Sequence, residues 1–77
     1  MKILTAHELY LIPRGYQSIA VDSEGVLSAF ECRKCDLIAG DRRWLISPDF
    51  KGSMHYPSVV VGYDYDPSDW KNSARNK

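Results

Sequence analysis

The chain has 77 residues with ten basic and ten acidic side chains, so its formal net charge at neutral pH is zero. This length predicts one small domain over residues 1–77 and excludes multidomain and barrel enzymes. The neutral balance excludes the cationic surface of a nonspecific nucleic-acid binder, and a hydrophobic fraction of 44% excludes a disordered segment.

The first residues indicate one helical turn. Thr5 and Glu8 have the spacing of a capping box, and Pro13 and Gly15 would end a helix that begins there. His7 and Glu8 interrupt the continuous apolar stretch that a signal peptide needs, and no apolar run reaches the length of a membrane span. We therefore expect a cytoplasmic protein without a membrane partner.

A β-hairpin is predicted over residues 16–31. Apolar and polar side chains alternate over residues 17–21 with the period of a half-buried strand. Asp22 favours the first position of a turn, and Gly25 supplies the positive φ that such a turn needs before the next strand. The second strand of the hairpin then covers residues 26–30.

Two further strands and a helix follow. The segment near 44–47 reads as a strand, and a strand near 58–65 places Val59, Val61, Tyr63 and Tyr65 on one face. Gly62 within it indicates a bulge or a close approach by a neighbouring residue.

A helix is expected near residues 67–75. Asp66 suits its N-cap, Pro67 its first position and Asp69 its first turn. Trp70 and Ala74 share one face of that helix, which would pack on the sheet.

These elements predict an α+β fold. We expect a three- or four-stranded antiparallel sheet, led by the 16–31 hairpin, with the C-terminal helix packed across one face. The predicted core consists of apolar residues from all of these elements. They are Ile19, Val21, Phe30, Leu45, Val59, Val61 and Trp70.

Cys32 and Cys35 are the only cysteines, and their spacing is that of a zinc-binding pair. A four-ligand site would need His7 and His55, or a second pair of thiolates across a symmetric dimer. A redox dithiol is a further alternative, although the chain lacks a thioredoxin-sized frame. We expect two reduced cysteines and no cofactor, with zinc as the alternative.

Partner binding is the class of function that the composition favours. Catalytic motifs are missing, so we expect no enzyme activity. The chain has five tyrosines and two tryptophans, more large rings than a small domain buries completely. We expect Arg42, Arg43, Tyr56 and Tyr65 to form the partner-binding surface. The strand at 58–65, if it lies at a sheet edge, would also suit pairing with a partner's strand or with a second copy.

Residues 20–25 read AVDSEG, residues 29–31 read AFE, Trp44 is central, and residues 69–73 read DWKNS. Together these motifs resemble a group of short, mostly uncharacterised accessory proteins of tailed bacteriophages. The similarity spans about residues 10–75 and departs at Cys32 to Cys35, where such proteins have a charged stretch with proline. It implies a small α+β fold and a phage accessory role without catalytic residues.

Three functions are therefore expected, in order. The first is a non-enzymatic accessory protein that binds and modulates a host protein in the bacterial cytoplasm by occluding a surface. The alternative is a zinc-stabilised nucleic-acid binder that uses Cys32 and Cys35 with Arg33, Lys34 and Arg43. The third is a sponge for small anionic or nucleotide ligands, and a homodimer remains open for each.

Overall fold

The computed structural model describes all 77 residues. A main sheet has four antiparallel strands in the order β5-β2-β1-β6, and a separate sheet pairs β3 with β4. The strands are β1 (Ser18–Val21), β2 (Leu27–Phe30), β3 (Leu37–Ala39), β4 (Trp44–Ile46), β5 (Ser58–Gly62) and β6 (Arg75–Asn76). The helical segments are short 3-10 helices, η1 (Ala6–Leu11), η2 (Lys34–Asp36) and η3 (Trp70–Asn72). The fold is thus mostly β, and the α+β expectation holds only loosely.

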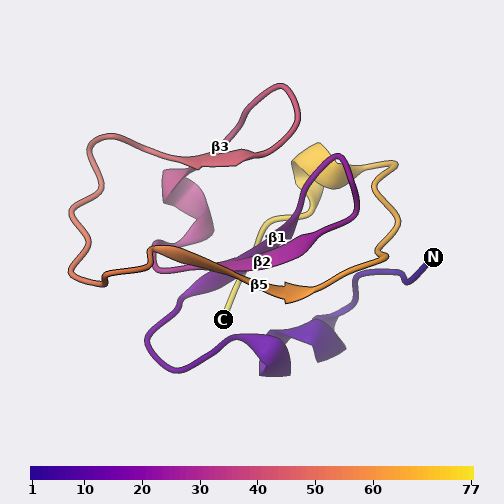
Figure 1. The fold of residues 1–77 in the computed structure, drawn as a ribbon, viewed down its shortest axis with the longest axis horizontal. Helices are drawn as coiled ribbons and strands as arrows, with labels where there is room; N and C mark the ends of the chain where they lie inside the picture. Colours follow the sequence, from indigo (N-terminus) through magenta and orange to yellow (C-terminus); the bar gives the residue numbers. More distant parts are fainter.

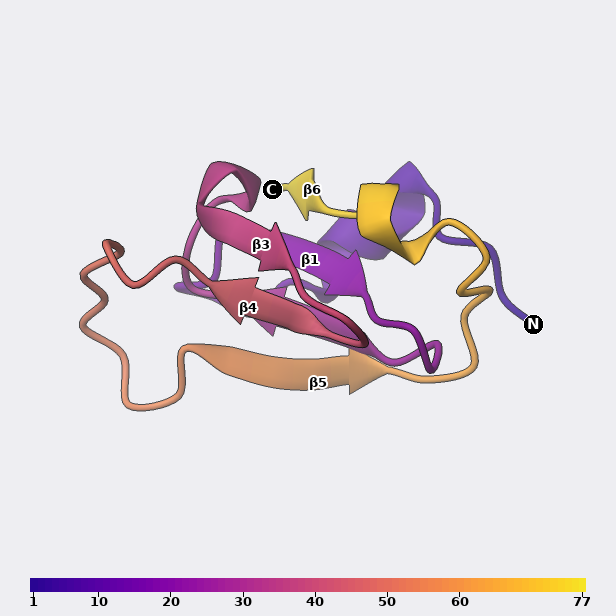
Figure 2. The same cartoon turned by 90° about the horizontal axis from the view of Figure 1, so that it is seen from above.

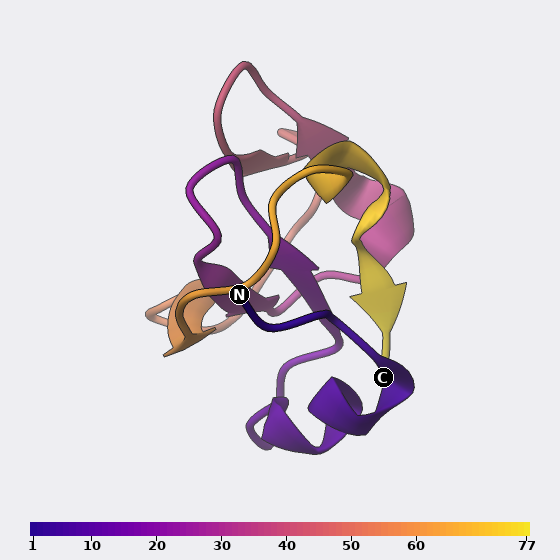
Figure 3. The same ribbon diagram turned by 90° about the vertical axis from the view of Figure 1, so that its right-hand side faces the viewer.

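The main sheet is the middle layer of the fold. η1 lies on one face, and the β3–β4 hairpin lies on the other with η2 and η3 (Figures 1 and 3). Two buried clusters fill the spaces between the layers. The larger contains Ile12, Tyr16, Ile19, Val21, Leu27, Ala29 and Tyr65, and the smaller contains Ala20, Phe30, Cys32 and Leu37.

The predicted 16–31 hairpin is confirmed. β1 and β2 pair in register, and the carboxylate of Asp22 accepts hydrogen bonds from the backbone N–H groups of Glu24 and Val26. Gly25 has a φ of 81° in this turn. The expectation of a half-buried first strand is wrong, because every residue of β1 is buried. β1 lies between two strands and between two layers, so both of its faces are covered.

The predicted strand near 44–47 forms as β4, but it does not join the main sheet. It pairs with β3, a strand that the sequence analysis did not predict. Leu37, Ile38 and Ala39 lie opposite Ile46, Leu45 and Trp44. Leu45 is 45% exposed, so its assignment to the core is wrong. Its side chain lies on the face of the hairpin that turns away from the main sheet, because Trp44 and Ile46 on either side pack inward.

The predicted strand near 58–65 ends early, at Gly62. Leu27 pairs with Gly62 but Ser28 pairs with Val60, which leaves Val61 as the extra residue of a bulge. A Cβ on Gly62 would lie 2.9 Å from the Tyr65 ring, so both readings of this glycine are confirmed. Asp64 has a φ of 67° and turns the chain, which buries Tyr65 and leaves Tyr63 exposed.

The predicted helix near 67–75 is wrong. The Asp66 carboxylate does accept a hydrogen bond from the Ser68 N–H, but only the single turn η3 follows. The chain then becomes extended as β6, which pairs with the free edge of β1. Trp70, expected in the core, is half-buried, as are Val59 and Val61, and all three pack against the larger cluster.

The expected N-terminal turn is confirmed as η1. The backbone N–H of Thr5 donates to the Glu8 carboxylate at 2.8 Å, and the Thr5 side chain completes the capping box. None of the three helical segments is long and apolar enough to cross a membrane.

Candidate protein-binding surface

The tip of the β3–β4 hairpin displays the two arginines that the sequence singled out. Arg42 and Arg43 are exposed, and the backbone N–H of Gly40 donates to the Arg43 carbonyl at 2.9 Å to close the turn. The N–H of Ser23 donates to the Arg42 carbonyl at 3.0 Å, which ties this tip to the β1–β2 turn. The arginine side chains therefore project from a backbone that is fixed at two points.

Trp44 fastens the hairpin to the main sheet. Its indole Nε1 donates to the carbonyl oxygen of Val21 at 2.8 Å. Its ring meets the Trp70 ring edge-to-face, with centroids 5.9 Å apart, and the Lys71 ammonium lies 5.6 Å from the centroid of Trp70. Such edge-to-face contacts favour one orientation of the two rings. The hairpin is thus held by its inward face.

The outward face of the hairpin carries an aliphatic pair. Ile38 and Leu45 lie directly opposite each other across the two strands. Their exposed fractions are 48% and 45%, respectively. Cross-strand neighbours of this kind contact each other, so the two side chains form one continuous apolar area beside the arginine tip. We call Ile38, Arg42, Arg43 and Leu45 the hairpin surface.

The four partner-binding residues expected from the sequence do not form one surface. Arg42 and Arg43 lie together, whereas Tyr56, 65% exposed, precedes β5. The hairpin tip lies over the end of β5, whereas Tyr56 precedes the start of that strand (Figure 2). The expectation that Tyr65 is exposed is wrong, because it is 4% exposed and burial raises the pKa of its hydroxyl.

The cysteine pair has no further metal-ligating side chain gathered around it within one chain. Both cysteines are free, and no group of three or more His, Cys, Asp or Glu side chains is close enough to hold a metal ion. Cys35 is exposed, but Cys32 is 1% exposed, and burial raises the pKa of its thiol, with the Asp36 carboxylate as the second cause. A thiol buried at this depth is also poorly placed for a site shared with a second copy.

The other basic residues lie apart from the hairpin tip. Arg33 and Lys34 stand at the start of η2, before β3, whereas Arg43 follows the turn after β3. The basic residues named for nucleic-acid binding are therefore divided between the two ends of one strand. Positive charge spread in this way gives no continuous track for a phosphate backbone.

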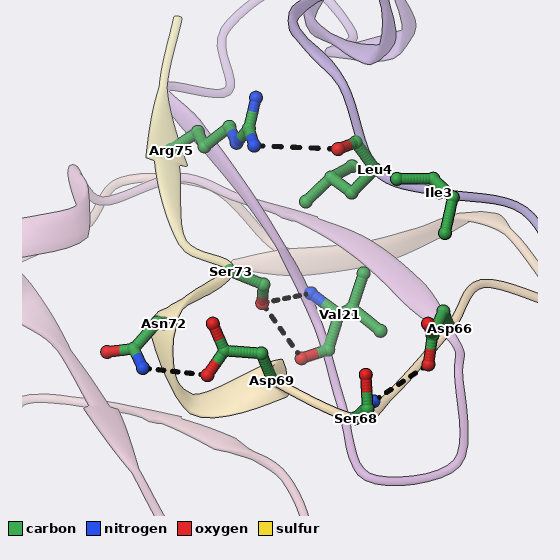
Figure 4. A pocket seen from close by; sticks show the side chains of 9 residues that line it. All are labelled: Ile3, Leu4, Val21, Asp66, Ser68, Asp69, Asn72, Ser73 and Arg75. Carbon is green, nitrogen blue, oxygen red and sulfur yellow. Dashed lines mark hydrogen bonds between the residues drawn. The ribbon is translucent and has the colours of Figure 1, made fainter.

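Two surface depressions bear on the prediction of a small-ligand sponge. One, of about 680 Å³, lies between the two hairpin tips, where Asp22, Glu24 and Asp41 accompany the two arginines. Three carboxylates disfavour an anionic ligand there. The other, of about 260 Å³, lies between η3, β1 and the N-terminal segment (Figure 4).

The polar groups of the smaller depression are largely occupied by one another. Figure 4 shows the amide of Asn72 donating to the carboxylate of Asp69, at 2.8 Å. The Ser68 N–H holds one oxygen of Asp66 and lowers the pKa of that carboxyl group. The Ser73 hydroxyl accepts from the Val21 N–H, and its single proton is shared between the carbonyl oxygens of Trp70, at 2.7 Å, and Val21, at 3.1 Å. The depression thus consists mainly of the contacts that fasten the C-terminal turn to β1.

Sequence reasoning missed Ile38. A local signal was present, since residues 37–39 and 44–46 are two short apolar runs separated by Gly40, Asp41 and the two arginines. Such runs around a Gly-containing polar stretch are typical of a hairpin. This pattern does not show which face of the hairpin packs on the main sheet, and the uncovered face is the one that leaves Leu45 exposed.

Comparisons with models of known protein families, with curated proteins and with solved structures find no match to this chain.

Proposed function

We propose that this chain is a small non-enzymatic binding module that docks on a bacterial host protein through the hairpin surface and modulates it by occlusion. The observation that supports this most is the exposed Ile38–Leu45 pair on the hairpin whose tip carries Arg42 and Arg43, with Leu45 lining one depression together with both arginines. Aliphatic side chains next to arginines are the composition of an interface centre with a charged margin.

The position of the aliphatic pair is unusual for a solvated ribbon. The uncovered face of an antiparallel sheet normally carries polar side chains. In the β3–β4 hairpin, the middle outward position of each strand is instead a large aliphatic residue, Ile38 or Leu45. A protein partner that covers the pair would remove this apolar area from water, which is favourable by roughly 25 cal/mol per Å².

The hairpin surface is also preorganised. Its backbone is fixed at the tip by the Ser23–Arg42 hydrogen bond and at its inward face by the Trp44–Val21 hydrogen bond. Binding therefore orders few additional groups beyond the two arginine side chains, and the entropic cost of association is correspondingly small. The complementary partner surface is apolar at its centre and acidic at its margin.

The phage resemblance supports the choice of partner. A chain of this size acts on another protein by covering a surface, and a phage accessory role places that partner in the host cytoplasm. The zinc-stabilised nucleic-acid binder and the nucleotide sponge have less support, because the ligands and basic residues that each requires are not gathered in one place.

Affinity capture from bacterial host lysate tests the proposal. The bait is the full chain, compared with a double variant Arg42→Glu/Arg43→Glu and with a second double variant Ile38→Ser/Leu45→Ser. The matched control is Tyr10→Ser/Arg14→Glu, which changes an exposed aromatic and an exposed arginine on or just after η1, on the other side of the sheet. Far-ultraviolet circular dichroism shows that each bait is folded.

The proposal predicts a host protein whose recovery falls at least about tenfold with both hairpin variants and not with the control. Recovery of the same proteins by all four baits would contradict it. So would the absence of any protein enriched by the unmodified chain.

A further inference from the structure

A second surface, distinct from the hairpin surface, lies along β5. This strand is an outer strand of the main sheet and lies along an open rim of the molecule (Figure 2). Residues 52–63 contain no Asp, Glu, Lys or Arg. The exposed fractions of Tyr56, Val60 and Tyr63 along this rim are 65%, 51% and 65%. Edge strands are commonly protected by charged side chains, and β5 has none.

The direction of the free backbone groups follows from the pairing with β2. The N–H of Glu31 donates to the carbonyl of Pro57 at 2.8 Å, so these two residues form a hydrogen-bonded pair. Such pairs alternate along an antiparallel ladder. Val59 therefore directs its backbone groups toward β2, whereas Ser58 and Val60 direct theirs outward, to the open edge. The bulge at Val61 ends this regular alternation.

We propose that two copies of this chain pair through β5 in antiparallel orientation, with the two-fold axis at Val59. In this register Ser58 lies opposite the partner's Val60, and Val60 opposite the partner's Ser58. Both are outward-directed positions, so each pair exchanges backbone hydrogen bonds while Val59 meets the partner's Val59 at a non-hydrogen-bonded position. The pairing uses the regular part of the strand and avoids the bulge.

Charge and side-chain complementarity favour a second copy as the occupant. Residues 55–63 map onto themselves about Val59, and this segment is uncharged, so no like charges face each other. The exposed tyrosines flank the paired strands at both ends.

The dimer would contain one continuous sheet of eight strands. A two-fold axis that relates neighbouring antiparallel edge strands is perpendicular to the sheet. Both β3–β4 hairpins then lie on the same face of the dimer, because each covers the same face of its own sheet. The dimer thereby presents two hairpin surfaces to one side.

Sedimentation equilibrium over a range of protein concentrations tests the pairing. Val60→Lys places a charge at the exposed edge position, and Val60→Pro removes an outward N–H that takes no part in the ladder with β2. Val60→Thr is the matched control, because it keeps the β-branched shape and the N–H. We expect reversible dimerisation of the unmodified chain and of Val60→Thr, and a dissociation constant at least about tenfold higher for the other two variants.

A disulfide test fixes the register. In a Cys35→Ser background, Val59→Cys would cross-link two copies on mild oxidation, because Cα atoms at a non-hydrogen-bonded antiparallel pair lie about 4.5 Å apart, within disulfide range. A monomer at every concentration would overturn the proposal. A dimer unaffected by Val60→Lys and Val60→Pro would also overturn it, since another surface would then join the copies.

Discussion

The indole nitrogen of Trp44 donates a 2.8 Å hydrogen bond to the backbone carbonyl oxygen of Val21, which joins the two sheets. Val21 is the last residue of β1 and is 1% exposed. β6 pairs only with Ser18 and Ile19, so the backbone of Val21 needs other partners. The hydroxyl of Ser73 accepts a hydrogen bond from the Val21 N–H at 2.9 Å and lies 3.1 Å from the Val21 carbonyl oxygen. Two side chains thus replace a neighbouring strand.

Replacing Trp44 tests the link between the sheets. Trp44→Phe keeps a ring against Trp70 but removes the donor to the Val21 carbonyl, which is left with the Ser73 hydroxyl that it shares with the Trp70 carbonyl. We expect the free energy of unfolding to fall by about 1 kcal/mol, and by about 2–3 kcal/mol for Trp44→Ala, which also removes the half-buried ring from its contact with Trp70. Urea denaturation measures both. Arg42→Ala, at the exposed tip, should stay within about 0.5 kcal/mol. If the Trp44→Phe protein were as stable as the unmodified chain, the Trp44–Val21 hydrogen bond would contribute nothing to the free energy of unfolding.

Ser73 has a larger predicted effect than its size suggests. Ser73→Ala leaves the buried N–H of Val21 without an acceptor, so we expect a loss of about 1–3 kcal/mol in the free energy of unfolding. Ser68→Ala is the matched control, because Ser68 is exposed and its hydroxyl makes no such contact. Hydrogen exchange gives a local check. The Val21 amide should exchange faster in Ser73→Ala, and unchanged exchange would show that Ser73 does not protect it.

Local patterns in the sequence predicted the elements whose stabilising contacts are local. The β1–β2 hairpin is encoded by Asp22 and Gly25 within its own turn, and η1 by the Thr5–Glu8 capping box. The C-terminal segment has helix signals as well, yet it forms β6. Its backbone completes the exposed edge of β1, where the N–H of Lys77 donates to the Gln17 carbonyl at 2.8 Å. That edge exists only in the folded chain, so helix propensity was overridden.

Only the charged residues of the candidate surface were predicted correctly from the sequence. Arg42 and Arg43 read as exposed from their charge, and they are. Leu45 was predicted to be buried and is exposed, whereas Tyr65 was predicted to be exposed and is buried. The apolar character of a residue does not reveal which face of its strand is covered. Leu45 lies on the open face of a two-stranded ribbon, while the turn at Asp64 directs Tyr65 into the core.

The two glycines with positive φ should respond differently to alanine. Gly25 has a φ of 81° and Gly15 a φ of 93°, so both alanine variants are strained. At Gly25 the added Cβ would also collide with the backbone carbonyl oxygen of Tyr65, whereas at Gly15 it would meet only the flexible end of Met54, at 3.4 Å. We expect a loss of about 1 kcal/mol for Gly15→Ala and clearly more for Gly25→Ala. Equal losses in thermal or urea unfolding would contradict the close approach of Tyr65.

Stability should fall at alkaline pH. Burial raises the pKa of the Cys32 thiol above its ordinary value of 9.0 and that of the Tyr65 hydroxyl above 10.0. As the pH rises, the unfolded chain loses each of these protons before the folded chain does. The free energy of unfolding is therefore unaffected by these groups below pH 9 and falls as the pH rises further. Urea midpoints measured from neutral to alkaline pH should decline from about pH 9.

Cys32→Ala separates the two groups. Without the thiol, the decline should begin only as the pH approaches the ordinary tyrosine pKa of 10.0. A thiol-specific reagent offers an independent check, since exposed Cys35 should react at once and Cys32 only when the chain unfolds. Stability that is constant or rises above pH 9 would contradict the burial of these two groups.

Photo-crosslinking in living host cells tests the proposed role of the hairpin surface most directly. A photoreactive amino acid is placed in turn at Ile38, at Leu45 and, on the opposite side of the sheet, at Tyr10, which is 79% exposed. The account predicts that the probes at Ile38 and Leu45 attach to the same host protein and that the probe at Tyr10 does not. Attachment of that protein through Tyr10 alone, or no attachment through either hairpin position, would contradict it.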